Sequence, residues 1–340
     1  MASVGYTDGV SKDAEPKRHH YVPRWHLKRF SNNSKNPRLW VFAKSRDAFY
    51  ETSITNAAVI HQYYRWDSGD ERAGVVEQGL AALDARAAEV LPRLERGHAL
   101  RGTEPNVVAA YVATQRARVP AMRESIQELI ETVGAYGAEQ TFAAQNEDEM
   151  FARALEEGRV RTREEFDQMR RESLEAVRER KVKVTMEPIM NFALHMQNTE
   201  QLAWYIEEMS WVILEAAPGS EFLISDNPVT LRSSAPEVAG WPPAFGDPDV
   251  EITLPLSGRA LLRISHDGSL QGRGCAVYAE VERFNRRTWE DAQEYVFGSS
   301  RGVLESMAAN LGQEERCKPG GRVAFAWDHE RQTFLPRATA

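Results

Sequence analysis

The chain has 340 residues, a net charge of −8, and 42% hydrophobic and 9% aromatic residues. This content supports one large or two ordinary folded domains and excludes a mainly disordered chain. Apolar runs of 18 residues are absent, and the first residues carry charges where a signal peptide would be apolar, so we expect a cytoplasmic protein without membrane contact. The two cysteines, Cys275 and Cys317, are too few for a disulfide framework or a cysteine-rich zinc site.

The negative total hides a basic segment between residues 17 and 46. This segment holds nine Lys or Arg residues, three His and no acidic residue, so it carries +9 while the remainder is near −17. Two interpretations stay open. The segment either pairs with Glu-rich helices elsewhere in the chain or docks an anionic partner.

In chain order, the sequence first predicts a disordered tail at 1–16 and then a small helix-and-hairpin unit at 17–66. Pro23 is typical of a helix start, here for a short helix at 24–30. Two apolar runs have the composition of strands, 39–42 and 59–66. Because a lone hairpin is marginally stable, we expect this unit to pack on a later sheet.

Residues 67–208 predict a helical lobe. Apolar residues at three-and-four spacing predict one helix from a capping box at 68–71 to Gly97. A second helix is predicted from Thr103, with a kink at Pro120 and an end at Gly134 and Gly137. Three further helices are predicted at 162–183, 186–196 and 201–208.

The pattern changes after Trp211 to short β-rich runs separated by Pro and Gly. Strands are predicted at 211–214, 222–224, 252–254, 260–264 and 323–327, with one helix at 282–297. The result is a single α+β domain over 17–340. In it the N-terminal hairpin unit packs with a mixed or antiparallel C-terminal sheet, residues 209–340, beside the central helical lobe.

Three polar clusters interrupt apolar sequence, and the first is His19-His20-Tyr21-Val22-Pro23. Imidazole titrates near neutral pH and can act as a general acid, an anion donor or a metal ligand. The alternative is a segment that simply packs against the sheet.

The second cluster lies where Pro120 interrupts an amphipathic helix, and it contains Gln115, Arg116 and Arg118. Polar residues at a helix break can point into a cavity. Since Arg116 and Arg118 point to opposite sides, only one of them can belong to a site.

The third cluster ends the apolar run at 222–224 with Ser-Asp-Asn-Pro. A carboxylate at the end of a buried strand, here Asp226, is a common catalytic or metal-binding position. The same residues also fit an Asx-turn in which Asp226 caps its own backbone.

Other catalytic motifs are set aside. Gly298 to Gly302 matches G-x-S-x-G, but it follows a predicted helix and lies near the chain end, with only His329 as a downstream histidine. Walker A, H-E-x-x-H and Rossmann glycine patterns are absent, which disfavours nucleotide hydrolysis and dinucleotide redox chemistry.

The three clusters together resemble a mainly bacterial family of standalone proteins defined only as a domain of unknown function. The resemblance covers roughly residues 17–300 and has no activity to carry over. One departure is Arg24-Trp25-His26, where the family more often has Gln-Phe-Tyr. The matching elements are His19 to Pro23 with Leu27 and Phe30, the Leu-Trp-Val at 39–41, Gln115 with Arg118 and Pro120, and the Ser-Asp-Asn-Pro at 225–228.

We expect the clusters to converge on one cleft, since each unpaired buried polar group would cost about 1–3 kcal/mol. The predicted catalytic residues are His19, His20, Gln115, Arg118, Asp226 and Asn227. The predicted substrate-binding residues are Tyr21, Arg24, Lys28 and Arg29.

Two functions fit this site. The first is a nuclease-like phosphodiester hydrolase acting on RNA or DNA, with His as acid or base and Arg118 on phosphate. The alternative is a non-catalytic protein that docks an acidic partner through residues 17–46.

The placement of the possible metal ligands argues against a zinc site, because adjacent His19 and His20 point to different sides and the other histidines are scattered. Mg²⁺ or Mn²⁺ stays open, held by Asp226 with waters and substrate phosphate.

Overall fold

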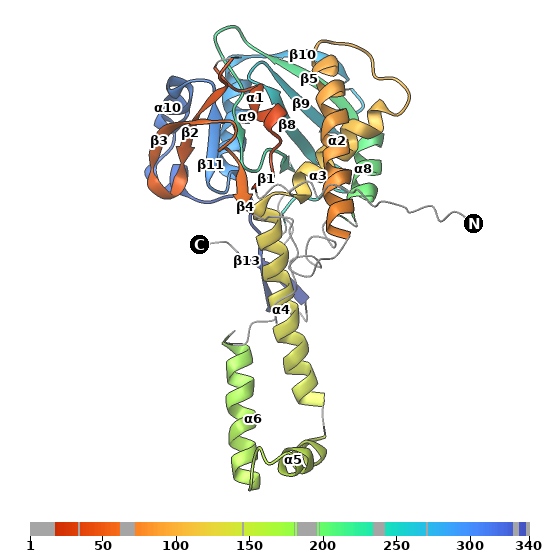
Figure 1. The fold of residues 1–340 in the computed structure, drawn as a ribbon, viewed down its shortest axis with the longest axis vertical. Coiled ribbons are helices and arrows are strands. Elements are labelled where there is room, and N and C mark those ends of the chain that lie inside the picture. Colours follow the sequence, from red (N-terminus) through yellow and green to blue (C-terminus); the bar gives the residue numbers. More distant parts are fainter. Residues whose placement is uncertain are drawn as a thin grey trace, which may run out of the picture.

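The computed structural model describes residues 18–32, 35–61, 72–144, 146–179, 181, 196, 198–233, 242–269, 271–328 and 333–337. The predicted tail at 1–16, the capping box at 68–71 and most of the predicted helix at 186–196 lie outside these ranges. A head holds the two larger sheets and most helices, and a helical arm extends from it (Figure 1). The α+β class is confirmed.

A five-stranded mixed sheet forms the larger half of the head. Its outer pair β10 and β5 is parallel, and all other neighbours are antiparallel. The strands across the sheet are β10 (Gly272–Ala276), β5 (Ser210–Ala216), β9 (Ala260–Ser265), β8 (Glu251–Ser257) and β7 (Thr230–Arg232). β5, β8 and β9 lie where the sequence predicted strands.

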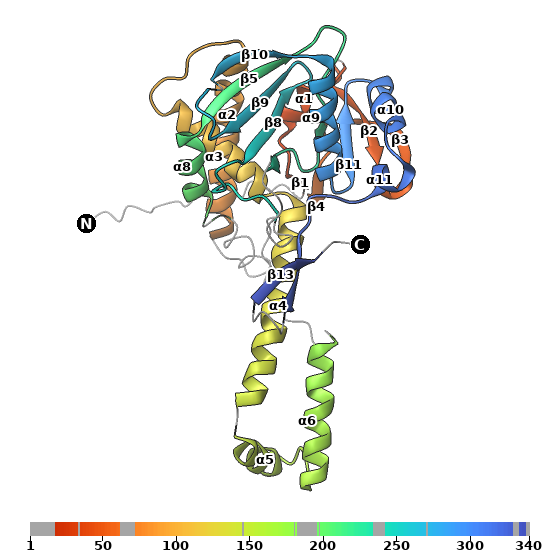
Figure 2. The ribbon, with the colours of Figure 1, turned by 180° about the vertical axis from the view of Figure 1, so that it is seen from behind.

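Helices cover both faces of this sheet. Helices α2 (Arg72–Glu95), α3 (Glu104–Ala117) and α8 (Thr199–Glu208) share one core cluster with strands β8 and β9. Helix α9 (Tyr278–Asp291) covers the opposite face with Val281 and Phe284, and Figure 2 shows it from that side. The sheet is therefore a layer between helices, with apolar residues on both faces.

The second sheet is four-stranded and antiparallel, and it combines strands from the N-terminal and C-terminal parts of the chain. Its strands in order are β3 (Ala48–Ser53), β2 (Arg38–Ala43), β11 (Tyr295–Gly298) and β6 (Ile224–Ser225). The N-terminal unit thus adds strands to a C-terminal sheet, where simple packing on it was expected. Short helices flank it, namely α1 (Arg24–Lys28), α10 (Arg301–Ala309) and α11 (Gln313–Cys317).

Strands form at 39–42 and in the described part of 59–66, as predicted, but they do not pair with each other. Strand β2 pairs with β3 across a short 3₁₀ turn, Lys44–Arg46, and β4 (Val59–His61) pairs with β1 (Arg18–His20). β3 is half-exposed along its length, so its sequence lacks the apolar run that marks a buried strand.

Two glycines fail to end a helix in the arm. Helix α4 (Pro120–Ala144) begins at the predicted break and continues through Gly134 and Gly137. A helical glycine costs only about 1 kcal/mol relative to Ala. The Thr132 hydroxyl contacts the Phe325 carbonyl, 3.1 Å away, in the hairpin of β12 (Ala324–Asp328) and β13 (Thr333–Arg337).

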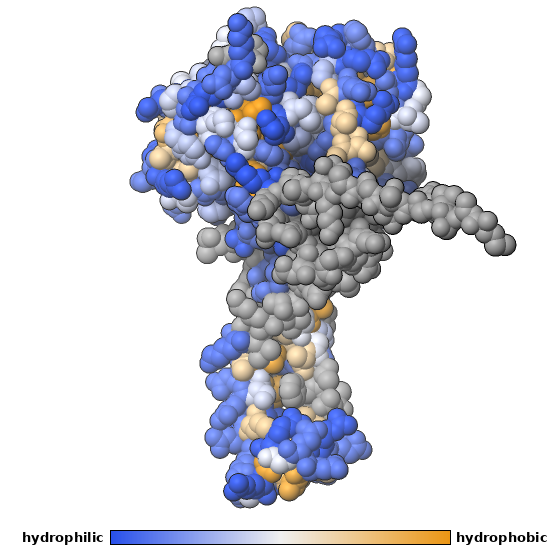
Figure 3. Space-filling view, in the orientation of Figure 1, coloured by the Kyte–Doolittle hydropathy of each residue, from blue (hydrophilic) through white to orange (hydrophobic). Residues whose placement is uncertain are grey.

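The rest of the arm is α5 (Glu147–Glu156), which the sequence did not predict, and α6 (Arg163–Arg178). α6 begins as predicted, because the Thr162 hydroxyl accepts a hydrogen bond from the Glu165 N–H at 3.2 Å. Figure 3 shows a largely hydrophilic surface on the visible face of the head, with hydrophobic residues emerging on the arm. No helix within the described ranges is long and apolar enough to cross a membrane.

Candidate functional site

The helix break at residues 118 and 119 anchors three segments to one another. Gln115 is buried, and its amide donates to the Tyr21 carbonyl at 2.9 Å. Arg118 is 2% exposed; its Nε donates to the Gln115 amide oxygen and its Nη1 to both Asp84 oxygens, each at 3.0 Å. Asp84, Gln115 and Arg118 are called the Arg118 network below. Arg118 is thereby placed to position Asp84 and Gln115 inside the protein.

A second buried contact continues this network. His26 Nε2 donates to the Pro255 carbonyl at 2.8 Å, so Nδ1 accepts from the Tyr111 hydroxyl at 2.8 Å. Complete burial lowers the pKa of His26 to about 3. The Arg118 guanidinium lies 5.6 Å from the centre of the Tyr111 ring. His26 is therefore a neutral structural residue that links α1, α3 and β8.

His19 points toward α2. It is 6% exposed, and its Nε2 lies 3.6 Å from the Glu77 carboxylate. Glu77 and Asp84 are seven residues apart and therefore share a helix face, which meets β1 and the helix break. Sequence reasoning missed both acids, although two carboxylates at this spacing on a predicted helix were a usable signal.

His20 has a different environment from its neighbour. Its Nδ1 donates to the Ala57 carbonyl at 3.1 Å, which leaves the lone pair on Nε2. Nε2 has no hydrogen-bond partner among the described residues. Partial burial lowers the pKa of His20, and the nearby charges of Arg24 and Arg18 lower it further. His20 is therefore neutral at pH 7, and the lone pair on its Nε2 can accept a proton.

Three exposed cations belong to the same region. Arg18 is held by the 55–56 turn, where its guanidinium donates to Asn56 at 2.9 Å. Arg24 and Lys28 are four residues apart on α1 and so lie on one face. Within the described ranges neither has a counter-ion. Arg18, His20, Arg24 and Lys28 are called the open group below.

The other two predicted substrate-binding residues serve the fold. Tyr21 is buried and accepts the Gln115 hydrogen bond through its carbonyl. Arg29 donates to the Leu256 carbonyl at 2.7 Å and forms an ion pair with Glu95 of α2. The pairing interpretation of the basic segment thus holds for Arg29, which pairs with a helix, while Arg24 and Lys28 remain exposed.

Asp226 lies in a separate buried network. It is 3% exposed, and its carboxylate accepts the backbone N–H groups of Gln293, Glu294 and Tyr295 at 2.7–2.9 Å. Burial raises the pKa of Asp226 to about 6 despite these donors and the charge of Lys44. The hydrogen bonds of Asp226 lead to this turn and not to either histidine of the first cluster.

These contacts also correct the predicted helix at 282–297. α9 ends at Asp291, because the N–H groups that would continue the helix are taken by Asp226, and residues 295–298 become β11. G-x-S-x-G consequently follows a strand, unlike the expectation. Ser300 has an ordinary extended backbone, φ −141°, and its hydroxyl caps α10 through the Val303 N–H at 3.4 Å. A strained nucleophile turn is not formed there.

Asn227 completes the Asp226 network. Its amide donates to the Asp291 carbonyl at 3.0 Å and accepts from Arg116 at 3.2 Å. Arg116 and Arg118 thus point to different networks. The name Asp226 network below covers Arg116, Asp226, Asn227 and residues 291–295.

A metal would meet different surroundings from those expected. Both Asp226 oxygens already accept backbone hydrogen bonds, so a divalent ion would compete with three donors. Within the described residues, no three His, Cys, Asp or Glu side chains are grouped to hold one ion.

Comparison with known proteins confirms the expected membership of a family of unknown function. Residues 18–302 match the family described as "Protein of unknown function (DUF4238)", a range that includes the open group and both buried networks. Neither a curated protein nor a solved structure matches the chain. Since the matched range covers most of its length, the chain belongs to the DUF4238 family.

Proposed function

We propose that the open group is the active site of a phosphodiester hydrolase, with His20 as its general base and then its general acid. The observation that carries this proposal is the Nε2 of His20, which has no hydrogen-bond partner in the described part of the chain, in a ring oriented by Ala57 and flanked by cations. A neutral imidazole held through its other nitrogen is suited to proton transfer at pH 7.

The reaction needs proton transfer and stabilisation of negative charge, and the open group offers groups for both. His20 Nε2 accepts a proton from the attacking water while the new P–O bond forms. Arg18 and Arg24 offset the charge that develops on the phosphoryl oxygens. As the old P–O bond breaks, the leaving oxygen takes the proton back from the imidazolium, and His20 is regenerated.

The buried residues act on this site through position. His19 beside Glu77 and the Gln115 bond to Tyr21 fix the backbone on both sides of His20. A displacement of about 1 Å in a catalytic group can cost about 100-fold in rate. We therefore assign Gln115, Arg118 and His19 a positioning role, and RNA or DNA remains the proposed substrate.

A binding protein is the second candidate. Exposed Arg24 and Lys28 without counter-ions among the described residues would attract an anionic partner even without chemistry. In that case the lone pair of His20 would have no catalytic use.

The deciding experiment incubates the purified protein with end-labelled RNA and DNA, with and without Mg²⁺ or Mn²⁺. We expect cleavage that falls about 100-fold or more in His20→Gln, as is typical for loss of an acid–base group. His98→Gln, at an exposed histidine in the loop between α2 and α3, is the matched control. If the substrates stay uncut but are retarded on a gel, and Arg24→Gln abolishes this retardation, the protein binds nucleic acid and does not hydrolyse it.

A further inference from the structure

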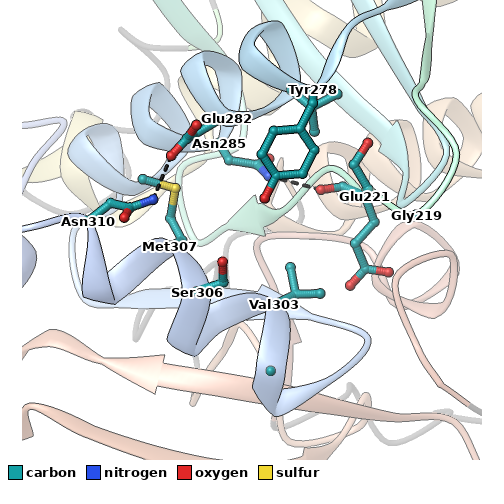
Figure 4. Close-up of a pocket in the computed structure, with 12 residues that line it drawn as sticks. Gly219, Glu221, Tyr278, Glu282, Asn285, Val303, Ser306, Met307 and Asn310 are labelled. Atoms are coloured by element: carbon teal, nitrogen blue, oxygen red, sulfur yellow. Dashed lines mark hydrogen bonds between the residues drawn. The ribbon is translucent and has the colours of Figure 1, made fainter.

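A pocket of about 200 Å³ lies on the other side of the head, between α9, α10 and the 219–221 loop (Figure 4). It shares no lining residue with the open group. Its principal walls are Glu221, Tyr278, Glu282, Val303, Ser306 and Met307.

The charged lining residues are both carboxylates. Glu221 accepts from the Ser299 hydroxyl at 2.7 Å, and Glu282 accepts from the Asn310 amide. Lys and Arg are absent from the residues that line this pocket. Both carboxylates therefore remain without a cationic partner inside it.

The wall between the carboxylates is fixed by Asn285. Its amide oxygen accepts the Leu223 N–H at 2.8 Å, and its amide nitrogen donates to the Glu221 carbonyl at 2.9 Å. These bonds tie the 219–221 loop to α9. The position of Glu221 relative to α9 is thus set before any ligand binds.

Apolar surface completes the pocket. Tyr278 is 62% exposed, and in Figure 4 its ring projects over the cavity above Val303 and Ser306. Val277 beside it is similarly exposed. An aromatic face near carboxylates attracts a cation by charge and by its π electrons.

We propose that this pocket binds an organic cation, a primary amine or guanidinium on a short apolar stem. Glu221 and Glu282, which lie on opposite sides of Tyr278 in Figure 4, each offer a carboxylate to the charged head, while Tyr278, Val303 and Met307 contact the stem. The volume is below the roughly 300–1,000 Å³ of sites for drug-sized ligands, so it suits one group the size of a basic side chain. Such a head comes either from a free small amine or from a Lys or Arg side chain of a partner.

The test is calorimetric titration of the full chain with 1,5-diaminopentane and with N-acetyl-lysine methylamide. Pentanol and pentanoate serve as neutral and anionic probes of the same stem. We expect the cations to bind, and the double variant Glu221→Gln/Glu282→Gln to weaken them about tenfold or more, because charge-assisted hydrogen bonds are lost. Tyr278→Ala should weaken them less.

Glu305→Gln, on α10 but outside the pocket walls, is the matched control and should bind as the parent does. Melting curves verify that each variant is folded. Binding of the diamine alone assigns a free amine, and binding of the lysine derivative alone assigns a side chain. Equal binding of pentanol, or unchanged affinity in a folded double variant, overturns the proposal. Hydrolysis by the open group is measured separately and is unaffected by either result.

Discussion

The open group and the Asp226 network look alike in sequence but differ in how much of their hydrogen-bonding capacity is unused. Each places polar residues beside a short apolar stretch of sequence. The Asp226 carboxylate accepts three backbone hydrogen bonds in the interior, whereas His20 uses one nitrogen and keeps the other free among the described residues. The difference teaches that a polar strand end becomes a candidate site only where hydrogen-bonding capacity remains unused.

Removal of the Arg118 side chain should have the largest effect on stability. Arg118→Met leaves Asp84 and Gln115 without their buried partner, and losing one member of such a pair costs about 3–5 kcal/mol. Urea denaturation measures the free energy of unfolding. A loss below about 1 kcal/mol would mean that the Arg118 network is as dispensable as a surface ion pair.

Asp226→Asn should be the next largest change. The amide nitrogen of Asn cannot accept, so N–H groups of the 293–295 turn lose their acceptor, at a cost of about 3 kcal/mol. The proposed nuclease activity, measured per folded molecule, should remain. If a stable variant instead loses all cleavage, Asp226 acts in the chemistry, and the contrast with the open group fails.

His26 should make the stability dependent on pH. Its pKa is about 3 in the folded state against 6.5 unfolded, so the unfolded chain binds more protons between these values. Stability from His26 is present above pH 6.5 and falls with pH below it, by about 2 kcal/mol at pH 5.

The measurement compares urea unfolding at pH 7.5 and pH 5 in the parent and in His26→Gln. The pair is required because Asp226, with its raised pKa, shifts stability the opposite way between pH 3.8 and about 6. The variant should lose about 2 kcal/mol less on acidification. Identical pH dependence in both proteins would show that His26 is not held neutral.

The smallest stability effect is expected in the open group. Arg24→Gln and Lys28→Gln remove exposed charges without partners among the described residues, so stability should change by less than about 0.5 kcal/mol. Nucleic-acid affinity should fall, and its dependence on salt should weaken, as measured by gel retardation at several salt concentrations. Unaltered affinity in both variants would show that Arg24 and Lys28 do not contact the nucleic acid.

The sequence determined much of the local structure. Thr162 marked the start of α6, Pro120 marked the break between α3 and α4, and β-rich runs located β5, β8 and β9. These features depend on neighbours within a few residues, such as a cap or a missing N–H, so they can be read along the chain. The motifs at 19–23, 115–120 and 225–228 likewise pointed to residues that the fold uses.

Only the tertiary structure decided the partners. β2 pairs with β3 and β11, which the sequence did not indicate, because β3 is half-exposed and β11 was read as part of a helix. α9 ends where it does because Asp226, about 65 residues earlier, takes the next N–H groups. His19 and His20 differ for the same reason, since Glu77 and Ala57 approach from other segments. Hydrogen-bond capacity is a property of each residue, but whether it is satisfied depends on groups brought close by folding.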